Sequence, residues 1–173
     1  MLFLVALVIG IAFGLLVGGR VGNLARLRFR WPWLLLVAVL VREIIVLTPL
    51  NLVEGLQYLY LLGLIAIVVW TVYHWRRLRG IWLVTIGAAL NVLVIAANGG
   101  RMPVAHEFAR SLVRSGTLGQ YTLMGSGTNL NFLGDWISLH PLSTVYSPGD
   151  VLIALGLAVT VFIATATPAR IVS

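Results

Sequence analysis

Long apolar stretches separated by short arginine-rich segments constrain this chain more than any other feature. A helix needs about 20 apolar residues to cross the roughly 30 Å hydrocarbon core of a bilayer. Five stretches approach that length: 1–19, 31–50, 55–73, 81–97 and 151–167. With 60% hydrophobic and 10% charged residues, the chain has too few charged side chains to cover a water-soluble domain. We therefore predict a single all-α membrane domain over residues 1–173, with about five transmembrane helices.

The arginines predict how these helices are oriented. Eight of them share one side of a five-span topology, without an acidic residue among them: Arg20, Arg26, Arg28, Arg30, Arg76, Arg77, Arg79 and Arg170. The positive-inside rule makes that side cytoplasmic, so we expect the N-terminus outside and the C-terminus inside a bacterial cell (inner) membrane. Because the net charge of +7 is distributed in this way, it indicates topology and not nucleic-acid binding.

Few residues offer metal or cofactor chemistry. The chain has no cysteine, and its three histidines are too scattered to suggest a metal site. No phosphate-binding loop, activated serine or cofactor fingerprint is present either. We predict neither a metal nor a cofactor.

Glycines at every fourth position predict a close helix contact. Gly10, Gly14, Gly18 and Gly22 lie along one face of the first predicted helix, where another backbone can approach closely. We favour packing inside the protein's own bundle over a homo-oligomer or membrane partner bound through Gly10, Gly14 and Gly18. Membrane lipid is the other expected partner.

Arg42 and Glu43 are the most unusual residues within the predicted spans. Arg42 would lie about 16 Å beyond Trp31, and Asn91 about 15 Å beyond Ile81, so both would be near mid-depth. Such groups are costly in a bilayer unless they face the bundle interior and find partners, and the three could form one polar cluster. Two interpretations stay open, a substrate or ion contact and a structural pair with the second helix ending at residues 47–50.

The outer loop, residues 98–150, carries most of the remaining polar material. A short amphipathic interfacial helix is predicted from Pro103 to Gly116, with Val104, Phe108 and Leu112 on one face and Glu107, Arg110 and Arg114 on the other. Glycines then interrupt any helical pattern, and 121–124 and 136–139 could pair as a small hairpin. An irregular loop of this composition is typical of a binding surface. Its candidate binding residues are Asn98, Arg101, Asn129, Asn131 and Trp136, in addition to Arg42, Glu43 and Asn91.

The only two aspartates both lie near the end of this loop. The sequence Ser147-Pro148-Gly149-Asp150 matches a capping box that starts the last helix, so Asp150 has a structural explanation. Asp135 could be a turn residue that bonds nearby amides. Alternatively, two carboxyls held close together can share a proton and activate water, as in aspartic peptidases.

Three motifs carry a resemblance to a known family. The segments Asn98–Val104 (NGGRMPV), Leu133–Ile137 (LGDWI) and Ser147–Ile153 (SPGDVLI) resemble a family of bacterial integral membrane proteins whose function is unknown. The resemblance extends over most of the chain and implies the membrane class without an activity.

A more distant resemblance is to lipoprotein signal peptidase, a membrane aspartic peptidase. Its final motif, before the last helix, is similar to Tyr146–Asp150, so Asp150 matches a catalytic position. Its Asp-Phe-Ile stretch is similar to Asp135–Ile137. The peptidase's first catalytic aspartate has no match here, and Asp135 would have to take that role.

The sequence supports three functional hypotheses. We favour a non-enzymatic binding or accessory protein that uses its outer loop. The alternatives are a membrane aspartic peptidase acting through Asp135 and Asp150, and a small transporter or channel component that relies on Arg42, Glu43 and Asn91.

Overall fold

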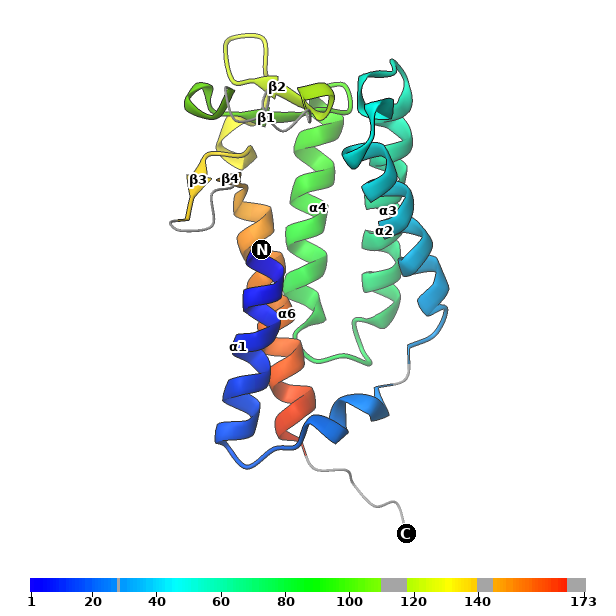
Figure 1. Cartoon of the computed structure of the whole chain (residues 1–173), viewed down its shortest axis with the longest axis vertical. Coiled ribbons are helices and arrows are strands. Elements are labelled where there is room, and N and C mark those ends of the chain that lie inside the picture. Colours follow the sequence, from blue (N-terminus) through cyan, green and yellow to red (C-terminus); the bar gives the residue numbers. More distant parts are fainter. Residues whose placement is uncertain (28, 110–117, 140–144, 168–173) are drawn as a thin grey trace.

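The computed structural model describes residues 1–27, 29–109, 118–139 and 145–167, and this part of the chain is mostly helical. Its five α-helices are α1 (Leu2–Leu16), α2 (Pro32–Leu47), α3 (Leu56–His74), α4 (Ile81–Ala97) and α6 (Pro148–Ala166). Short 3₁₀ segments occupy Val21–Arg26, Pro49–Leu52, His106–Phe108, Leu118–Gln120 and Asn131–Leu133. The helices lie along the long axis of the molecule, and short β segments cover one end (Figure 1).

Two of these helices are long and apolar enough to cross a membrane. They are α3 and α6, of 19 residues each, whereas α1 and α4 are apolar but shorter. Only 17% of the most apolar stretch of α3 and 28% of that of α6 are buried, and the other residues of these stretches are partly or fully exposed. Such exposure is unlike the core helix of a water-soluble protein. The crossing of a membrane by all five helices stays a prediction.

The glycines of α1 bring this helix against α6. A Cβ atom on Gly10 would lie 2.5 Å from the carbonyl oxygen of Ala158, and one on Gly14 would lie 2.6 Å from Cβ of Thr165. These two glycines therefore permit the close packing within the bundle that the sequence favours. Nothing lies within 4 Å of a Cβ built on Gly18, and a homo-oligomer or partner contact stays a prediction.

A second close approach joins α4 to α6. A Cβ atom on Gly87 would collide with the carbonyl oxygen of Gly149, and one on Gly149 would collide with the side chain of Asn91. Because both positions are glycine, the start of α6 lies directly against the middle of α4. This crossing brings the polar groups at the start of α6 within reach of Asn91.

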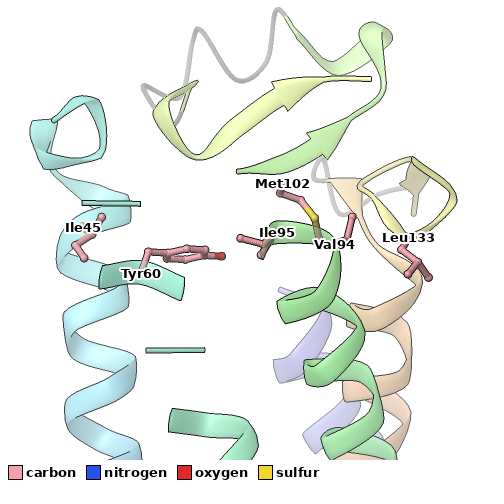
Figure 2. Close-up of a cluster of buried hydrophobic side chains, with 6 residues drawn as sticks. All are labelled: Ile45, Tyr60, Val94, Ile95, Met102 and Leu133. Atoms are coloured by element: carbon pink, nitrogen blue, oxygen red, sulfur yellow. The ribbon is translucent and has the colours of Figure 1, made fainter. Parts of the chain in front are cut away.

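A hydrophobic core connects the α2–α3 pair to α4 at the end beneath the β segments. Its buried members are Ile45, Tyr60, Val94, Ile95, Met102 and Leu133. The ring of Tyr60 extends from α3 toward Ile95 on α4, and Met102 lies next to Ile95 (Figure 2). This core supports one side of the site described below.

At the opposite end, His74 attaches the segment before α2 to α3. Its side chain is completely buried, and Nε2 accepts a hydrogen bond of 3.1 Å from the backbone N–H of Arg30. Its Nδ1 lies 2.8 Å from the carbonyl oxygen of Trp70, and the Trp70 indole N–H donates to the carbonyl oxygens of Arg30 and Trp31. All of these polar groups have partners within the protein.

The outer loop forms strands, but with partners that the sequence did not predict. Strand β1 (Met102–Val104) pairs in parallel with β2 (Tyr121–Leu123), and β3 (Ile137–Ser138) pairs antiparallel with β4 (Val145–Tyr146). The predicted hairpin between 121–124 and 136–139 is therefore wrong. Its two strands each pair instead with a neighbour whose strand character the sequence analysis missed.

The predicted amphipathic helix is wrong over its first residues. Pro103 and Val104 belong to β1 and are buried, a 3₁₀ turn, His106–Phe108, follows, and Ala109 is helical. Proline is tolerated here because β1 bonds through its remaining backbone groups; the carbonyl oxygen of Pro103 accepts from the N–H of Asp135. The rest of the predicted helix, 110–117, lies outside the described residues.

Candidate functional site

A cavity of about 300 Å³ lies between the helices, beneath the β segments. Its lower part is apolar and is formed by Phe3, Val39, Leu64, Ile67, Val84, Ala88 and Ile153. Its upper part is polar and contains Arg42, Glu43, Tyr60, Asn91, Gln120, Tyr121, Asp135 and Asp150. A mostly apolar cavity with a few converging polar groups is typical of a small-molecule site.

Asp150 enters the cavity from the first turn of α6, where it completes the predicted capping box. The Ser147 hydroxyl accepts from the Asp150 backbone N–H (3.0 Å), and Asp150 Oδ2 accepts from the Ser147 backbone N–H (3.3 Å). The other oxygen, Oδ1, accepts a 2.8 Å hydrogen bond from Asn91 Nδ2. The capping role predicted for Asp150 is confirmed, and both of its oxygens are engaged.

Asn91 connects this cap to α4. Its side-chain oxygen accepts a 2.8 Å hydrogen bond from the Ser147 hydroxyl, while its nitrogen donates to Asp150. Ser147 is completely buried and Asn91 is 8% exposed, so these bonds replace solvent for three polar groups. Asn91 therefore has a structural role even though it lines the cavity.

Arg42 and Glu43 reach the cavity from α2. Arg42 Nη1 forms an ion pair with Glu43 Oε1, and both side chains are half-buried. Arg42 Cζ also lies 5.7 Å from the centre of the Tyr60 ring, within cation–π range. The three residues of the predicted polar cluster thus line one cavity, but Arg42 pairs with Glu43 whereas Asn91 pairs with Asp150.

Asp135 approaches the cavity from the β segments. Its backbone is held beside β1, because its N–H donates to the Pro103 carbonyl oxygen (2.8 Å) and its carbonyl oxygen accepts from the Ala105 N–H (3.0 Å). The side chain is only 4% exposed, and its Oδ1 atom has no hydrogen-bond partner in the described part of the chain. Burial, and then the nearby charge of Asp150, raises the pKa of this carboxyl well above its ordinary value of 3.8. The Asp135 carboxyl consequently stays protonated to a higher pH than an ordinary aspartic acid does.

Gln120 is the second polar residue of the cavity with an unpartnered atom; among the described residues, the hydroxyls of Thr160 and Thr165, which do not line the cavity, also lack a partner. Gln120 ends the 3₁₀ turn before β2, is 6% exposed, and its Nε2 atom has no hydrogen bond to any described residue. Its neighbour Tyr121 also lines the cavity, and burial raises the pKa of that phenol. Buried polar groups normally find partners, so Gln120 and Asp135 are exceptions that the fold alone does not explain.

The other predicted binding residues lie away from this cavity. Asn98 and Asn129 bind each other's segments, with the Asn129 N–H donating to Asn98 Oδ1 at 2.8 Å and Asn98 Nδ2 donating to the Asn129 carbonyl oxygen at 2.9 Å. Asn131 bonds to Thr128, and the Trp136 indole N–H donates to the Phe132 carbonyl oxygen. These side chains shape the loop, and Arg101 is exposed beside them.

A comparison with known protein families identifies the family of this chain. Residues 26–162 match a family described as a family of unknown function, DUF5317. The chain belongs to this family. The matched part of this DUF5317 protein runs from the segment before α2 into α6 and includes every polar residue of the cavity. The predicted membership of a family of unknown function is confirmed. The chain matches no curated protein and no solved structure.

Sequence analysis of this DUF5317 protein missed three polar residues of the site: Tyr60, Gln120 and Tyr121. Tyr60 resembled an aromatic residue of the outer membrane boundary, although Arg42 on the preceding helix needed a partner at the same depth. Gln120 and Tyr121 lie in an irregular loop, where no periodicity indicates which side chains face inwards. Within the described residues, no three acidic, histidine or cysteine side chains gather closely enough to hold a metal ion.

Proposed function

We propose that this DUF5317 protein is a multi-pass protein of the bacterial cell membrane, and that its cavity binds an amphiphilic membrane molecule. The predicted spans, 1–19, 31–50, 55–73, 81–97 and 151–167, each overlap one of the five helices, although α3 ends one residue after its span and α6 begins three residues before its span. Large apolar side chains remain exposed along these helices, for example Leu4 (58%), Leu62 (60%) and Val69 (62%). A hydrocarbon environment would remove the cost of exposing them to water.

The placement of charge supports an outward-facing cavity. Arg20 follows α1, and Arg76, Arg77 and Arg79 lie between α3 and α4, at the end of the bundle opposite the β segments (Figure 1). The positive-inside rule would make this end cytoplasmic. The cavity and the β segments would then lie at the outer boundary of the membrane, with the N-terminus outside.

The observation that carries the proposal is the pair of unpartnered groups at the polar end of the cavity. Gln120 Nε2 and Asp135 Oδ1 are both buried, and neither has a hydrogen bond to the described residues. Leaving such groups unpaired costs about 1–3 kcal/mol each, and a bound polar group would recover that free energy. The apolar remainder of the cavity would accept a hydrocarbon chain.

The route into the cavity is suggested by two of its lining residues. Phe3 of α1 and Val39 of α2 both contribute to the wall, and each is 37% exposed. α1 packs mainly on α6, and α2 packs mainly on α3. A membrane molecule would therefore enter sideways, between α1 and α2, without leaving the bilayer.

The test is to identify what co-purifies with the protein from its native membrane. Mass spectrometry of solvent extracts should find an amphiphile with the wild type and with Val37→Trp, because Val37 is exposed on α2 without lining the cavity. Val39→Trp should block the opening and reduce the bound amphiphile at least about tenfold. Equal amounts in both variants, or none in the wild type, would contradict the proposal.

A membrane aspartic peptidase is the second candidate, because Asp135 and Asp150 line one cavity. Burial and the Asp150 charge raise the pKa of Asp135, which supports a proton donor at this position. Against this role, both oxygens of Asp150 already accept hydrogen bonds, Oδ2 from the Ser147 N–H of the cap and Oδ1 from Asn91. If the protein cleaves an acylated peptide, Asp135→Asn and Asp150→Asn should each abolish cleavage. Unchanged cleavage in either variant would exclude the dyad.

A further inference from the structure

The polar end of the cavity restricts the charge of its ligand. One guanidinium, that of Arg42, lines the cavity in the described residues, together with the three carboxyls of Glu43, Asp135 and Asp150. Arg42 is already paired with Glu43. Even with Asp135 protonated, the lining carries no net positive charge. A phosphate or carboxylate head group would find no unpaired cation in this lining, so its binding would be disfavoured.

The unpartnered groups restrict the ligand further. The Gln120 side chain is an amide, which offers both a donor and an acceptor. A protonated Asp135 carboxyl likewise offers one O–H donor and acceptor oxygens, and its burial favours this form. An ammonium group has donors only, and an ether oxygen is only an acceptor. An ammonium group therefore could not accept from Gln120 Nε2, and an ether oxygen could accept from that atom but could not donate to Asp135 Oδ1.

We propose that Gln120 and Asp135 bind an uncharged amide group, carried by an amphiphile whose hydrocarbon chain occupies the apolar part of the cavity. An amide supplies a carbonyl acceptor and an N–H donor without a charge, so it complements both side chains. This assignment rests on the proposed function, because it names the chemical class of the ligand in the same cavity. The amide belongs either to an N-acylated lipid or to an acylated peptide, and the two sources share this chemistry.

The test compares ligands that have the same oleyl or oleoyl chain and different polar groups. N-oleoylethanolamine carries a lipid amide, and N-oleoyl-trialanine amide carries a peptide. Oleyl methyl ether offers an acceptor without a donor, and oleyl phosphate is anionic. Apparent dissociation constants are measured by native mass spectrometry of the full-length protein released from detergent micelles. At least one amide should bind about tenfold or more tightly than the ether and the phosphate. Which amide binds more tightly identifies the source.

Three variants connect this preference to the two side chains. Gln120→Leu removes the unpartnered amide. This variant should no longer bind the amides more tightly than the ether, and its affinity for the ether should stay within about twofold of the wild type. Asp135→Leu should likewise weaken the preference. Asp135→Asn should keep the preference, because asparagine still donates and accepts, whereas a catalytic aspartate would not tolerate this change.

The outcomes separate the two proposals. If the amides and the ether bind equally and Val39→Trp blocks all of them, the cavity binds amphiphiles and the amide assignment is wrong. Tightest binding of oleyl phosphate, or a preference that survives Gln120→Leu, would also overturn the assignment. If none of the four ligands binds to the wild type, both proposals fail.

Discussion

Asp150 and Asp135 line the same cavity from opposite regions, one from the start of α6 and the other from the β segments. Asp150 lies in a closed network, in which the side chains of Ser147 and Asn91 and the backbone N–H groups at the start of α6 satisfy one another. Asp135 is fixed through its backbone, and its side-chain Oδ1 has no partner in the described chain. The backbone of Asp135 is thus hydrogen-bonded beside β1, whereas the side chain that it carries into the cavity keeps one oxygen without a hydrogen bond.

The difference suggests how to separate structural from functional polar groups. A buried polar group that stabilises the fold has its partners inside the protein, whereas one that serves a ligand is left unpaired until the ligand binds. Applied to the groups that line the cavity, this criterion assigns Asn91 and Asp150 to the fold, and we propose that Gln120 and Asp135 serve a ligand; the unpaired hydroxyls of Thr160 and Thr165 do not line the cavity. The following predictions test this division, beginning with the largest expected effect.

Asn91→Leu should destabilise the protein by about 2–4 kcal/mol, because it leaves Asp150 Oδ1 and the Ser147 hydroxyl without their partner. Reversible unfolding in mixed detergent micelles gives the free energy of unfolding. Leu93→Ala is the matched control, because Leu93 lies on the same helix and is 52% exposed; it should change stability by less than about 1 kcal/mol. A similar effect in both variants would mean that the closed network contributes little.

Asp135 should make the stability depend on pH. Its pKa is raised in the folded protein, so the folded state binds a proton that the unfolded state has already released above about pH 3.8. Stability should therefore fall as the pH rises from about 4 through the folded pKa, by up to about 1.4 kcal/mol per pH unit. Asp135→Asn should remove this contribution, as seen in melting curves of the two proteins between pH 4 and 8. Parallel curves would show that Asp135 is not buried as described.

Gln120→Leu should have the smallest effect on stability. Because Gln120 Nε2 has no partner to lose, the ligand-free variant should unfold within about 1 kcal/mol of the wild type, or be slightly more stable. The same chemical change at Asn91 is expected to be much more harmful. A loss above about 2 kcal/mol in the Gln120 variant would remove the distinction between the two regions.

The sequence predicted the helices and one of the two aspartates well. Uncharged stretches set by bilayer thickness led to Ile81–Ala97, the same residues as α4, and the capping box at Ser147–Asp150 is present because its spacing is local. The close packing of Gly10 and Gly14 within the bundle was also predicted, since it follows from a four-residue repeat. These features depend on residues only a few positions apart.

The site depended on contacts that no local pattern contains. Asp135 reaches the cavity because its backbone pairs beside β1, about thirty residues earlier in the chain, and β1 itself was expected to be helical. The parallel pairing of β1 with β2 could not be predicted from a local pattern either, because parallel strands are joined by a long connection. Gln120 was missed for the same reason, since only tertiary packing buries it.

The most direct test is an experimental structure of the protein purified from its native membrane, at a resolution that shows a bound chain. The proposed binding function predicts elongated density in the cavity, with its polar end within about 3.2 Å of Gln120 Nε2 and an Asp135 carboxyl oxygen. A cavity that is empty or filled by the protein's own side chains, with Gln120 and Asp135 bonded to other residues of the chain, would contradict it.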